Sequence, residues 1–171
     1  MLPENFRRPY FALDISDFWR RWHISLSNFL RDYLYIPLGG SRNGPVRYAC
    51  ATMVTMGLCG LWHGAGWTFV TWGLWHGLGL CVCRAWKALG FALPAIPAWL
   101  LTMLFVGVGW VLFRAVDFHS ATSILSSLVG ANGLHGELHK AKLLAVAALA
   151  CAIIPSAHQI KEGLQLSLIH I

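Results

Sequence analysis

Charged side chains are scarce in this sequence. Only 12% of its 171 residues are Asp, Glu, Lys or Arg, and only 7 are acidic, whereas about a quarter of the residues of an ordinary soluble domain are charged. Apolar residues make up 57% of the chain and come in long blocks, and the mean hydropathy is +0.58. This composition excludes an ordinary soluble domain and points to a protein whose solvent is the lipid bilayer.

Two further features are missing. The N-terminus, MLPENFRRPYF, carries charges where a secretory signal peptide has its apolar core, so targeting depends on internal membrane segments or on a region outside this chain. The 5 cysteines lie in apolar runs and have neither the spacing of a redox pair nor that of a zinc site. We interpret all of them as packing residues and expect no bound metal.

Positive charge is concentrated near the N-terminus. The net charge is +6 and the isoelectric point is near 9.4. The arginines in the first 47 residues are Arg7, Arg8, Arg20, Arg21, Arg31, Arg42 and Arg47. Basic residues beside apolar segments favour contact with anionic lipid headgroups. No platform of basic and aromatic residues accompanies them, so we expect no nucleic-acid partner.

Residues 14–34 are predicted to form one amphipathic helix. Apolar residues recur along it at spacings of three and four: Ile15, Trp19, Trp22, Leu26, Phe29 and Tyr33. Asp14, Ser16 or Asp17 can cap its start. We expect this helix to lie in the membrane interface, with its tryptophans and arginines at the level of the headgroups. The alternative is an ordinary amphipathic helix on a soluble core.

Four apolar spans follow this N-terminal part of residues 1–47. They lie at residues 48–62, 67–86, 91–113 and 142–157. The middle two are long enough to cross about 30 Å of hydrocarbon, whereas the outer two are short enough to be tilted, re-entrant or buried in protein. A polar connection at 114–141 contains a candidate short helix at 121–129. We predict an all-α fold, a polytopic transmembrane helical bundle with an N-terminal amphipathic interfacial helix, in one domain over residues 1–171. Basic residues flank both ends of most spans, so the orientation stays open.

The tripeptide Trp-His-Gly occurs twice in the nearly uncharged run GLCGLWHGAGWTFVTWGLWHGLGL of residues 57–80. His63 is followed by Gly64, Ala65 and Gly66, and such small residues allow a chain break at membrane depth where the break lines a cavity. We therefore expect His63 to face a protein-lined cavity as a neutral imidazole, the form that a general base requires. A histidine hydrogen-bonded between helices is the alternative.

The other two histidines of interest differ from His63. His76 lies ten residues after Gly66, about 15 Å further along a continuous helix, so it cannot easily join His63 at one centre. We interpret His76 as structural, with a ring nitrogen hydrogen-bonded to a neighbouring helix. His23 lies on the arginine-rich helix, one turn from Ser27. The two elements that carry His23 and His63 can converge, although a histidine on a helix surface is usually just solvated.

Four stretches of the sequence closely resemble the membrane-bound O-acyltransferases, in particular the bacterial alginate O-acetyltransferase branch. They are PENFRRPY (3–10), DFWRRWHISLSNFLRDYLYIPLGGSRNG (17–44), GLWHGAGWTFVTWGLWHG (60–77) and WVLFRAVDF (110–118). The D-alanyl transfer protein of teichoic acid synthesis is a more distant relative. Members of the family carry further transmembrane helices before the first stretch, so we expect this chain to be a C-terminal portion. Its tail LSLIHI has no counterpart that we recognise.

The resemblance implies a multi-pass enzyme of the bacterial inner membrane whose helices surround a tunnel. It implies transfer of an acyl group from a cytoplasmic donor, acetyl-CoA or another acyl thioester, toward hydroxyls of an extracytoplasmic polysaccharide such as alginate. It also implies a periplasmic or extracellular partner protein for the transfer and no bound cofactor.

The resemblance also assigns roles to residues. His63 matches the histidine of the LWHG motif, the proposed catalytic residue, and His23 matches its companion in the FWRRWHISLS motif. Neutral His63 would take the proton from the attacking hydroxyl while its cavity excludes water. His23 would orient the substrate or stabilise developing negative charge. Trp62, Arg20 and Ser27 are assigned to substrate binding, and Gly64, Gly66 and His76 to structure.

Two other classes of function stay open. A membrane haem or metal protein would use intramembrane histidines as ligands, but a bis-histidine site requires ligands at one depth on facing helices, which His63 and His76 do not offer by simple spacing. A non-catalytic membrane scaffold would explain the apolar spans. It does not explain the presence of the long polar and aromatic stretch of residues 17–44.

Overall fold

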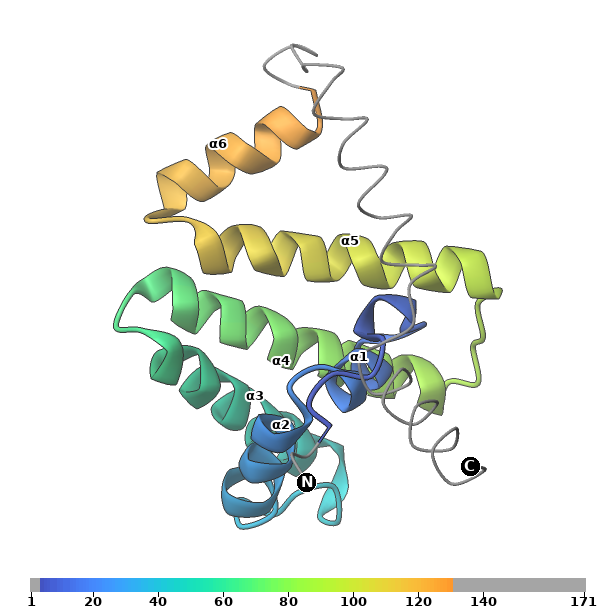
Figure 1. The fold of residues 1–171 in the computed structure, drawn as a ribbon. Helices are drawn as coiled ribbons and strands as arrows, with labels where there is room; N and C mark the ends of the chain where they lie inside the picture. The colour runs from blue at the N-terminus through green and yellow to red at the C-terminus, as the bar shows by residue number, and fades with distance from the viewer. Residues whose placement is uncertain (1–3, 131–171) are drawn as a thin grey trace, which may run out of the picture. The chain divides into compact units, whose positions relative to one another are not determined.

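A computed structural model of the chain describes residues 4–130 (Figure 1). In chain order the elements are the 3-10 helix η1 (Pro9–Phe11), α1 (Ile15–Arg21), α2 (Ile24–Leu30), the π-helical turn η2 (Arg31–Tyr35), α3 (Gly44–His63), α4 (Trp67–Ala88), α5 (Ala95–Arg114) and α6 (Phe118–Leu128). These described residues contain no strand, which confirms the all-α prediction for this part of the chain. They form one compact unit up to Leu128. The grouping of the whole chain into one domain stays a prediction.

The prediction of a single helix over residues 14–34 is wrong, because the backbone breaks at Trp22 and His23. Trp22 is extended, and His23 has a φ of 44°, the left-handed conformation that a β-carbon disfavours. The N–H of Ile24 donates to the backbone oxygen of Asn5 at 2.9 Å. The hydrophobic periodicity runs through the break and does not reveal it, because the competing hydrogen-bond partner comes from far upstream in the chain.

Of the N-terminal helices, α1 packs against α4. Ile15 and Trp19 of α1 are buried, whereas Phe29 and Tyr33, further along the expected apolar stripe, are 53% and 68% exposed. Only the first part of the stripe therefore faces the core. Trp19 is buried in the helical packing, and its position at the level of the headgroups stays a prediction.

The helices α3 and α4 form an antiparallel hairpin (Figure 1). Only residues 64–66 separate them, so the chain breaks where the sequence predicts. A β-carbon on Gly60 would collide with the backbone of Phe69, and one on Gly73 would collide with the backbone carbonyl of Met56. These two glycines allow the two backbones to approach each other closely, which brings the end of α3 against α4.

The helix α5 packs antiparallel to α4 on its other side. Pro94 is the N-cap residue of α5, where a missing N–H does least harm, so the helix begins slightly later than the expected span. The indole N–H of Trp75 donates to the backbone oxygen of Phe105 at 3.0 Å. A β-carbon on Gly109 would lie 2.7 Å from Nε2 of His76. The glycine thus makes room for a buried imidazole between the two helices.

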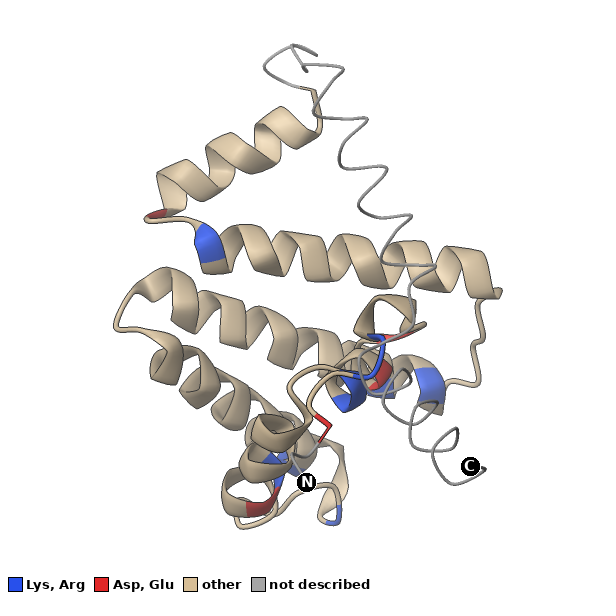
Figure 2. Ribbon diagram, in the orientation of Figure 1, with Lys and Arg blue, Asp and Glu red and all other residues tan. Residues whose placement is uncertain are grey.

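Among the described residues, α5 is the one helix long and apolar enough to span a membrane, with a mean hydropathy of 2.0. The helices α3 and α4 have 20 and 22 residues, enough for about 30 Å of rise, but they are less apolar. The charged residues of all three helices lie near their ends (Figure 2). The helices coincide closely with the first three predicted spans, and their crossing of a membrane stays a prediction.

The polar connection after α5 contains α6, which begins earlier than the expected helix at 121–129. The carboxylate of Asp117 accepts a hydrogen bond from the N–H of Ser120 at 2.7 Å and caps this helix. The rest of the connection, the predicted span at 142–157 and the tail at 166–171 lie outside the described residues.

Candidate active site

His63 is the last residue of α3 and lies among aromatic rings. Its ring centroid is 4.9 Å from that of Trp62, 5.2 Å from that of Trp72 and 5.1 Å from that of Phe113. The imidazole is half-buried, and it makes no hydrogen bond to another described residue. Packing alone fixes the ring, so in the neutral imidazole one nitrogen can donate a hydrogen bond to a substrate and the other can take a proton.

His23 lies at the break between α1 and α2, on an element separate from α3. Its Nδ1 is buried and has no hydrogen-bond partner among residues 4–130, and its ring lies 5.9 Å from that of Phe6. His63 lies within the electrostatic influence of His23, although no hydrogen bond or ring contact joins these two described residues. The structure therefore places the two histidines that the motifs assign to catalysis on separate elements and within electrostatic range of each other.

His76 is enclosed, with 1% of its surface exposed. Its Nδ1 accepts a hydrogen bond from the indole N–H of Trp19 at 3.3 Å, a bond to a neighbouring helix of the kind the sequence predicts. The Trp72 ring contacts both His76 and His63. The two histidines thus lie closer together than their spacing along the chain suggests, because α3 and α4 fold back on each other.

Two tryptophans of this cluster are absent from the site residues predicted by sequence. Trp72 contacts Trp19 at 6.0 Å between ring centroids and is itself 6% exposed. The sequence contains an indication for Trp72. This residue precedes His76 by four positions, so the two side chains lie on the same face of α4. For Trp19 the apolar stripe indicated only a buried or interfacial position.

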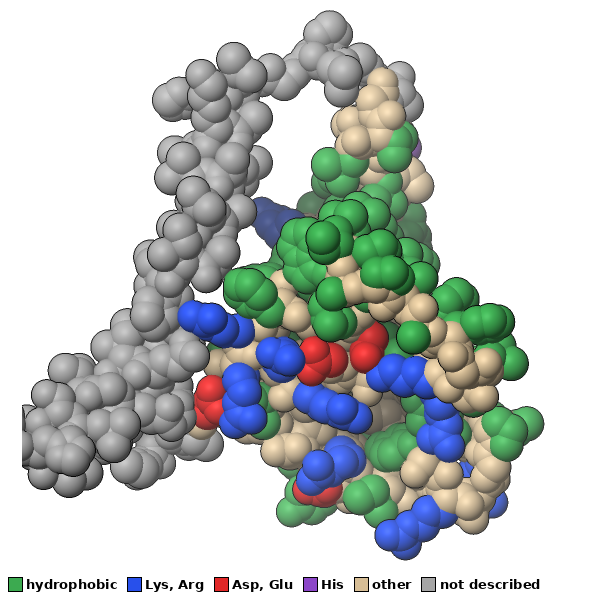
Figure 3. All heavy atoms as spheres, turned by 90° about the vertical axis from the view of Figure 1, so that its right-hand side faces the viewer, with side chains coloured by type: hydrophobic (Ala, Val, Ile, Leu, Met, Phe, Trp, Pro, Cys, Tyr) green, Lys and Arg blue, Asp and Glu red, His purple; other side chains and the backbone are tan. Residues whose placement is uncertain are grey.

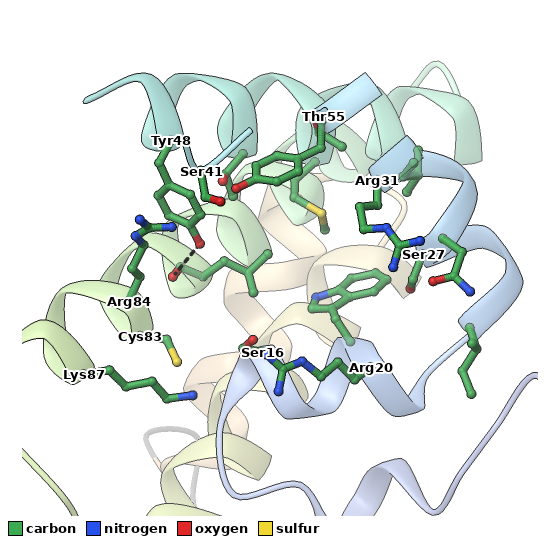
Figure 4. A pocket seen from close by; sticks show the side chains of 18 residues that line it. Ser16, Arg20, Ser27, Arg31, Ser41, Tyr48, Thr55, Cys83, Arg84 and Lys87 are labelled. Atoms are coloured by element: carbon green, nitrogen blue, oxygen red, sulfur yellow. Dashed lines mark hydrogen bonds between the residues drawn. The ribbon is translucent and has the colours of Figure 1, made fainter. Parts of the chain in front are cut away.

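A cavity of about 570 Å³ opens beside this cluster, between the N-terminal helices and the α3–α4 hairpin (Figure 4). Its apolar lining is Trp19, Ile24, Leu30, Met56 and Leu80, and its cationic lining is Arg20, Arg31, Arg84 and Lys87. Neither His23 nor His63 lines it. Trp19 lines the cavity and contacts Trp72, whose ring contacts His63, so ring contacts connect the cavity wall to His63.

The cavity carries an excess of positive charge. Lys87 pairs with Asp14 at 2.7 Å and Arg31 pairs with Asp32 at 2.8 Å. Arg20 and Arg84 have no carboxylate partner within the described part of the chain, and the Arg84 guanidinium lies 4.1 Å from the centre of the Tyr48 ring. Figure 3 shows the Lys and Arg side chains gathered on one face, with a hydrophobic region beside them. An anionic ligand is therefore favoured here.

The pKa of Asp14 is affected by Lys87, the cavity residue with which its carboxylate pairs. Partial burial acts to raise the pKa of its carboxyl, but the hydrogen bond with Lys87, the backbone N–H of Asp17 and the Lys87 charge together outweigh burial. The pKa of Asp14 consequently lies below its ordinary value. The carboxylate stays ionised and neutralises Lys87, which leaves Arg20 and Arg84 as the cations without a carboxylate partner among the described residues.

The predicted substrate-binding residues are divided between two places. Arg20 and Ser27 line the cavity, whereas Trp62 lies against His63 and is 68% exposed. Of the two glycines in the chain break, Gly64 leaves no room for a β-carbon beside the ring of Phe69. Gly66 has an ordinary backbone conformation and more space around it.

The described residues give the haem or metal interpretation no support. No three side chains of His, Cys, Asp or Glu within residues 4–130 converge as metal ligands would. Of the two histidines that a bis-histidine haem would use, His76 already accepts a hydrogen bond through Nδ1, and its Nε2 lies against Gly109.

Comparison with known proteins gives one family. Residues 1–127 match the sequence profile of the membrane-bound O-acyltransferase family. The chain is 50% identical to a peptidoglycan O-acetyltransferase of Helicobacter pylori over 137 residues, which cover 78% of the chain and 26% of that protein. It is 44% identical to a probable alginate O-acetylase of Pseudomonas putida over 160 residues, 88% of the chain and 32% of that protein.

A more distant match is to a teichoic acid D-alanyltransferase of Streptococcus thermophilus. The identity is 34% over 91 residues, which cover 49% of the chain and 22% of that protein. The chain therefore spans between about a quarter and a third of the length of the first two relatives, 26% and 32%.

Proposed function

The chain belongs to the membrane-bound O-acyltransferase family, and from this premise we propose that it forms part of an enzyme that transfers an acetyl group from a thioester to the hydroxyls of a bacterial polysaccharide. One observation carries the proposal: His23 and His63 lie on separate elements, and His63 is nevertheless within the electrostatic influence of His23. A non-catalytic scaffold needs no such arrangement, and it would not need to keep a buried histidine nitrogen unpaired, which costs free energy.

The chemistry assigned to His63 is general base catalysis. The acceptor hydroxyl oxygen attacks the carbonyl carbon of the thioester while a nitrogen of His63 takes the hydroxyl proton. The carbon–sulfur bond then breaks, and the thiolate that leaves takes that proton to become a thiol. The products are an O-acetyl ester and a free thiol, and His63 returns to its neutral form. The surrounding rings of Trp62, Trp72 and Phe113 limit the access of water to the thioester.

His23 acts on the same carbonyl group. During attack the carbonyl oxygen becomes negatively charged, and a donor fixed close to it lowers the barrier. The buried, unpaired Nδ1 of His23 is suited to this role or to orienting the acceptor hydroxyl. A strained backbone at φ 44° fits a residue whose position is set by function.

The acetyl donor binds in the cavity beside Trp19. Guanidinium groups suit phosphate oxygens because they donate paired hydrogen bonds, and the apolar part of the lining suits the rest of a thioester arm. Acetyl-CoA has both features, so it is the favoured donor, and it is a substrate and not a resident cofactor. The acetyl group would pass Trp19 and Trp72 to reach His63.

The family resemblance also supports a proposal for the setting of the reaction. A polytopic protein of the bacterial inner membrane would take the donor from the cytoplasm, and a periplasmic or extracellular protein would present the acceptor hydroxyl to His63 from the outer face. Alginate and peptidoglycan are the acceptors named for the two first relatives, and either is a candidate here.

Reconstituted full-length protein tests this proposal. Proteoliposomes supplied with acetyl-CoA labelled in the acetyl group should transfer label to alginate or to peptidoglycan glycan chains, in the presence of periplasmic extract that supplies a partner. The label should be released by mild base, as an O-acetyl ester is. Absence of label from both polysaccharides, with acetyl-CoA left intact, would contradict the proposal.

A further inference from the structure

We propose that Asn5 is a positioning residue for His23. The N-terminal segment supplies the helix cap that His23 itself does not supply, and so keeps the imidazole free. This inference rests on the role proposed for His23 in acyl transfer. It assigns a function to Asn5, whose side chain lies on a part of the chain remote in sequence from both histidines.

The cap of α2 is unusual. His23 occupies the N-cap position but makes no side-chain cap hydrogen bond, whereas this position is normally held by Ser, Thr, Asp or Asn, whose oxygen accepts from the first turn. Here the side-chain oxygen of Asn5 accepts from the backbone N–H of Ser25 at 3.0 Å and from the Ser25 hydroxyl at 2.7 Å. The backbone oxygen of Asn5 accepts from Ile24 at 2.9 Å. Asn5 therefore satisfies the first two N–H groups of the helix.

The segment of residues 5–7 also holds the end of α1, on the other side of the break at Trp22 and His23. The N–H of Arg7 donates to the backbone oxygen of Arg21, the last residue of α1, at 2.9 Å. Between these two attachments the ring of Phe6 packs on that of Trp22 at 5.0 Å and on that of His23 at 5.9 Å. Three consecutive residues of the segment thus fix the end of α1, the break and the start of α2.

The arrangement explains how a histidine is kept in a left-handed conformation. That conformation costs free energy for a residue with a β-carbon, and the hydrogen bonds to Asn5 offset the cost. If His23 capped the helix with its own ring, the ring nitrogen would be engaged with the backbone. Because Asn5 takes over the cap, Nδ1 of His23 keeps no partner within residues 4–130.

Two substitutions in the full-length protein test the inference. Asn5→Ala removes the capping oxygen, and Asn5→Asp keeps an oxygen in the same place. With acetyl-CoA as donor, kcat of Asn5→Ala should fall roughly 10- to 100-fold, the usual effect of misplacing a group in an active site, while KM for acetyl-CoA changes little. Asn5→Asp should retain most of the native kcat, because a carboxylate accepts from Ser25 as the amide oxygen does.

A matched control separates positioning from general stability. Asp117→Ala removes an equivalent cap from α6, and it should lower thermal stability by a similar amount with kcat per folded molecule unchanged. A second readout does not need turnover: the rate at which diethyl pyrocarbonate modifies His23, followed by mass spectrometry, should rise in Asn5→Ala but not in Asn5→Asp or Asp117→Ala.

The outcomes distinguish this inference from the proposed function. Unchanged kcat and unchanged His23 modification in folded Asn5→Ala would overturn the inference, and so would equal losses of kcat in Asn5→Ala and Asn5→Asp. If the native protein transfers no acetyl group but the modification rates follow the expected order, positioning stands and the proposed function fails.

Discussion

Three histidines of one chain occupy three different settings. His76 is enclosed and hydrogen-bonded, His63 is half-buried among aromatic rings, and His23 has a buried nitrogen with no partner among the described residues. A buried ring whose polar atom is paired contributes to stability, whereas a ring whose nitrogens have no hydrogen-bond partner among the described residues is available for proton transfer. The settings therefore predict different consequences of substitution.

Replacement of His76 by alanine should mainly affect folding. It removes the acceptor of the Trp19 N–H and leaves a cavity among aromatic rings, so we expect the free energy of unfolding to fall by roughly 2–4 kcal/mol. Thermal unfolding in detergent and the amount of protein in membranes measure this, and activity should fall in proportion to folded protein. Normal accumulation of an inactive His76→Ala protein would place His76 in the catalytic site instead.

The sequence singles out His23, His63 and Trp62 as candidate site residues, but it does not single out Trp19 and Trp72. His23 and His63 stand in polar or glycine-rich surroundings that mark them, and the family resemblance assigned their roles. Trp19 and Trp72 look like other apolar residues of a helix, and only tertiary packing shows that their rings connect the cavity wall to His63. Arg84 and Lys87 likewise appeared as the flank of an apolar span, since only folding brings them to Arg20.

At the scale of elements, the α3–α4 hairpin depends on close contact between backbones. Gly73→Ala would place a β-carbon against the carbonyl of Met56, so it should destabilise the protein by about 1–3 kcal/mol. Gly107 in α5 is the matched control, because a β-carbon there meets nothing within 4 Å among the described residues. Gly107→Ala should be neutral or stabilising. Equal melting temperatures for the two variants would contradict the close contact.

Asp14 joins α1 to α4. Its carboxylate caps α1 at the N–H of Asp17 and pairs with Lys87. Its folded pKa lies below the ordinary 3.8, so the carboxylate stabilises the fold above that pH, and the contribution is lost as the pH falls through the lower folded value. Asp14→Asn keeps a capping oxygen without the charge. Between about pH 5 and about pH 3 the melting temperature of Asp14→Asn should therefore fall less than that of the native protein. Equal falls in the two proteins would show that ionisation of Asp14 does not stabilise the fold.

The elements themselves were predictable to different degrees. Long apolar runs bounded by Gly64, Gly66 and Pro94 located α3, α4 and α5 to within a few residues, because a run of that length has few alternatives to a helix. The break at His23 was missed. Local sequence favours a continuous helix there, and the hydrogen bonds from Asn5 that oppose it come from another part of the chain.

For the whole molecule, the exposed apolar surface predicts residence in a membrane. In α5, Ile96, Leu101 and Leu104 are 73%, 61% and 68% exposed, and the helix has the hydropathy of a membrane span. The full-length protein should remain in the membrane pellet after washing with alkaline carbonate, since burial of apolar helices in lipid does not depend on charge. Release into the supernatant, as for a peripheral protein, would contradict this placement.

The central claim is that His63 acts as a general base, and the full-length His63→Gln protein tests it most directly. Glutamine retains hydrogen bonding but cannot accept a proton near neutral pH. Folding and membrane accumulation should be native, because His63 is held by ring packing and makes no hydrogen bond to a described residue. Acetyl transfer from labelled acetyl-CoA should fall roughly 10²- to 10⁴-fold. Substantial transfer by well-folded His63→Gln protein would show that His63 only orients the substrate, and would contradict the claim.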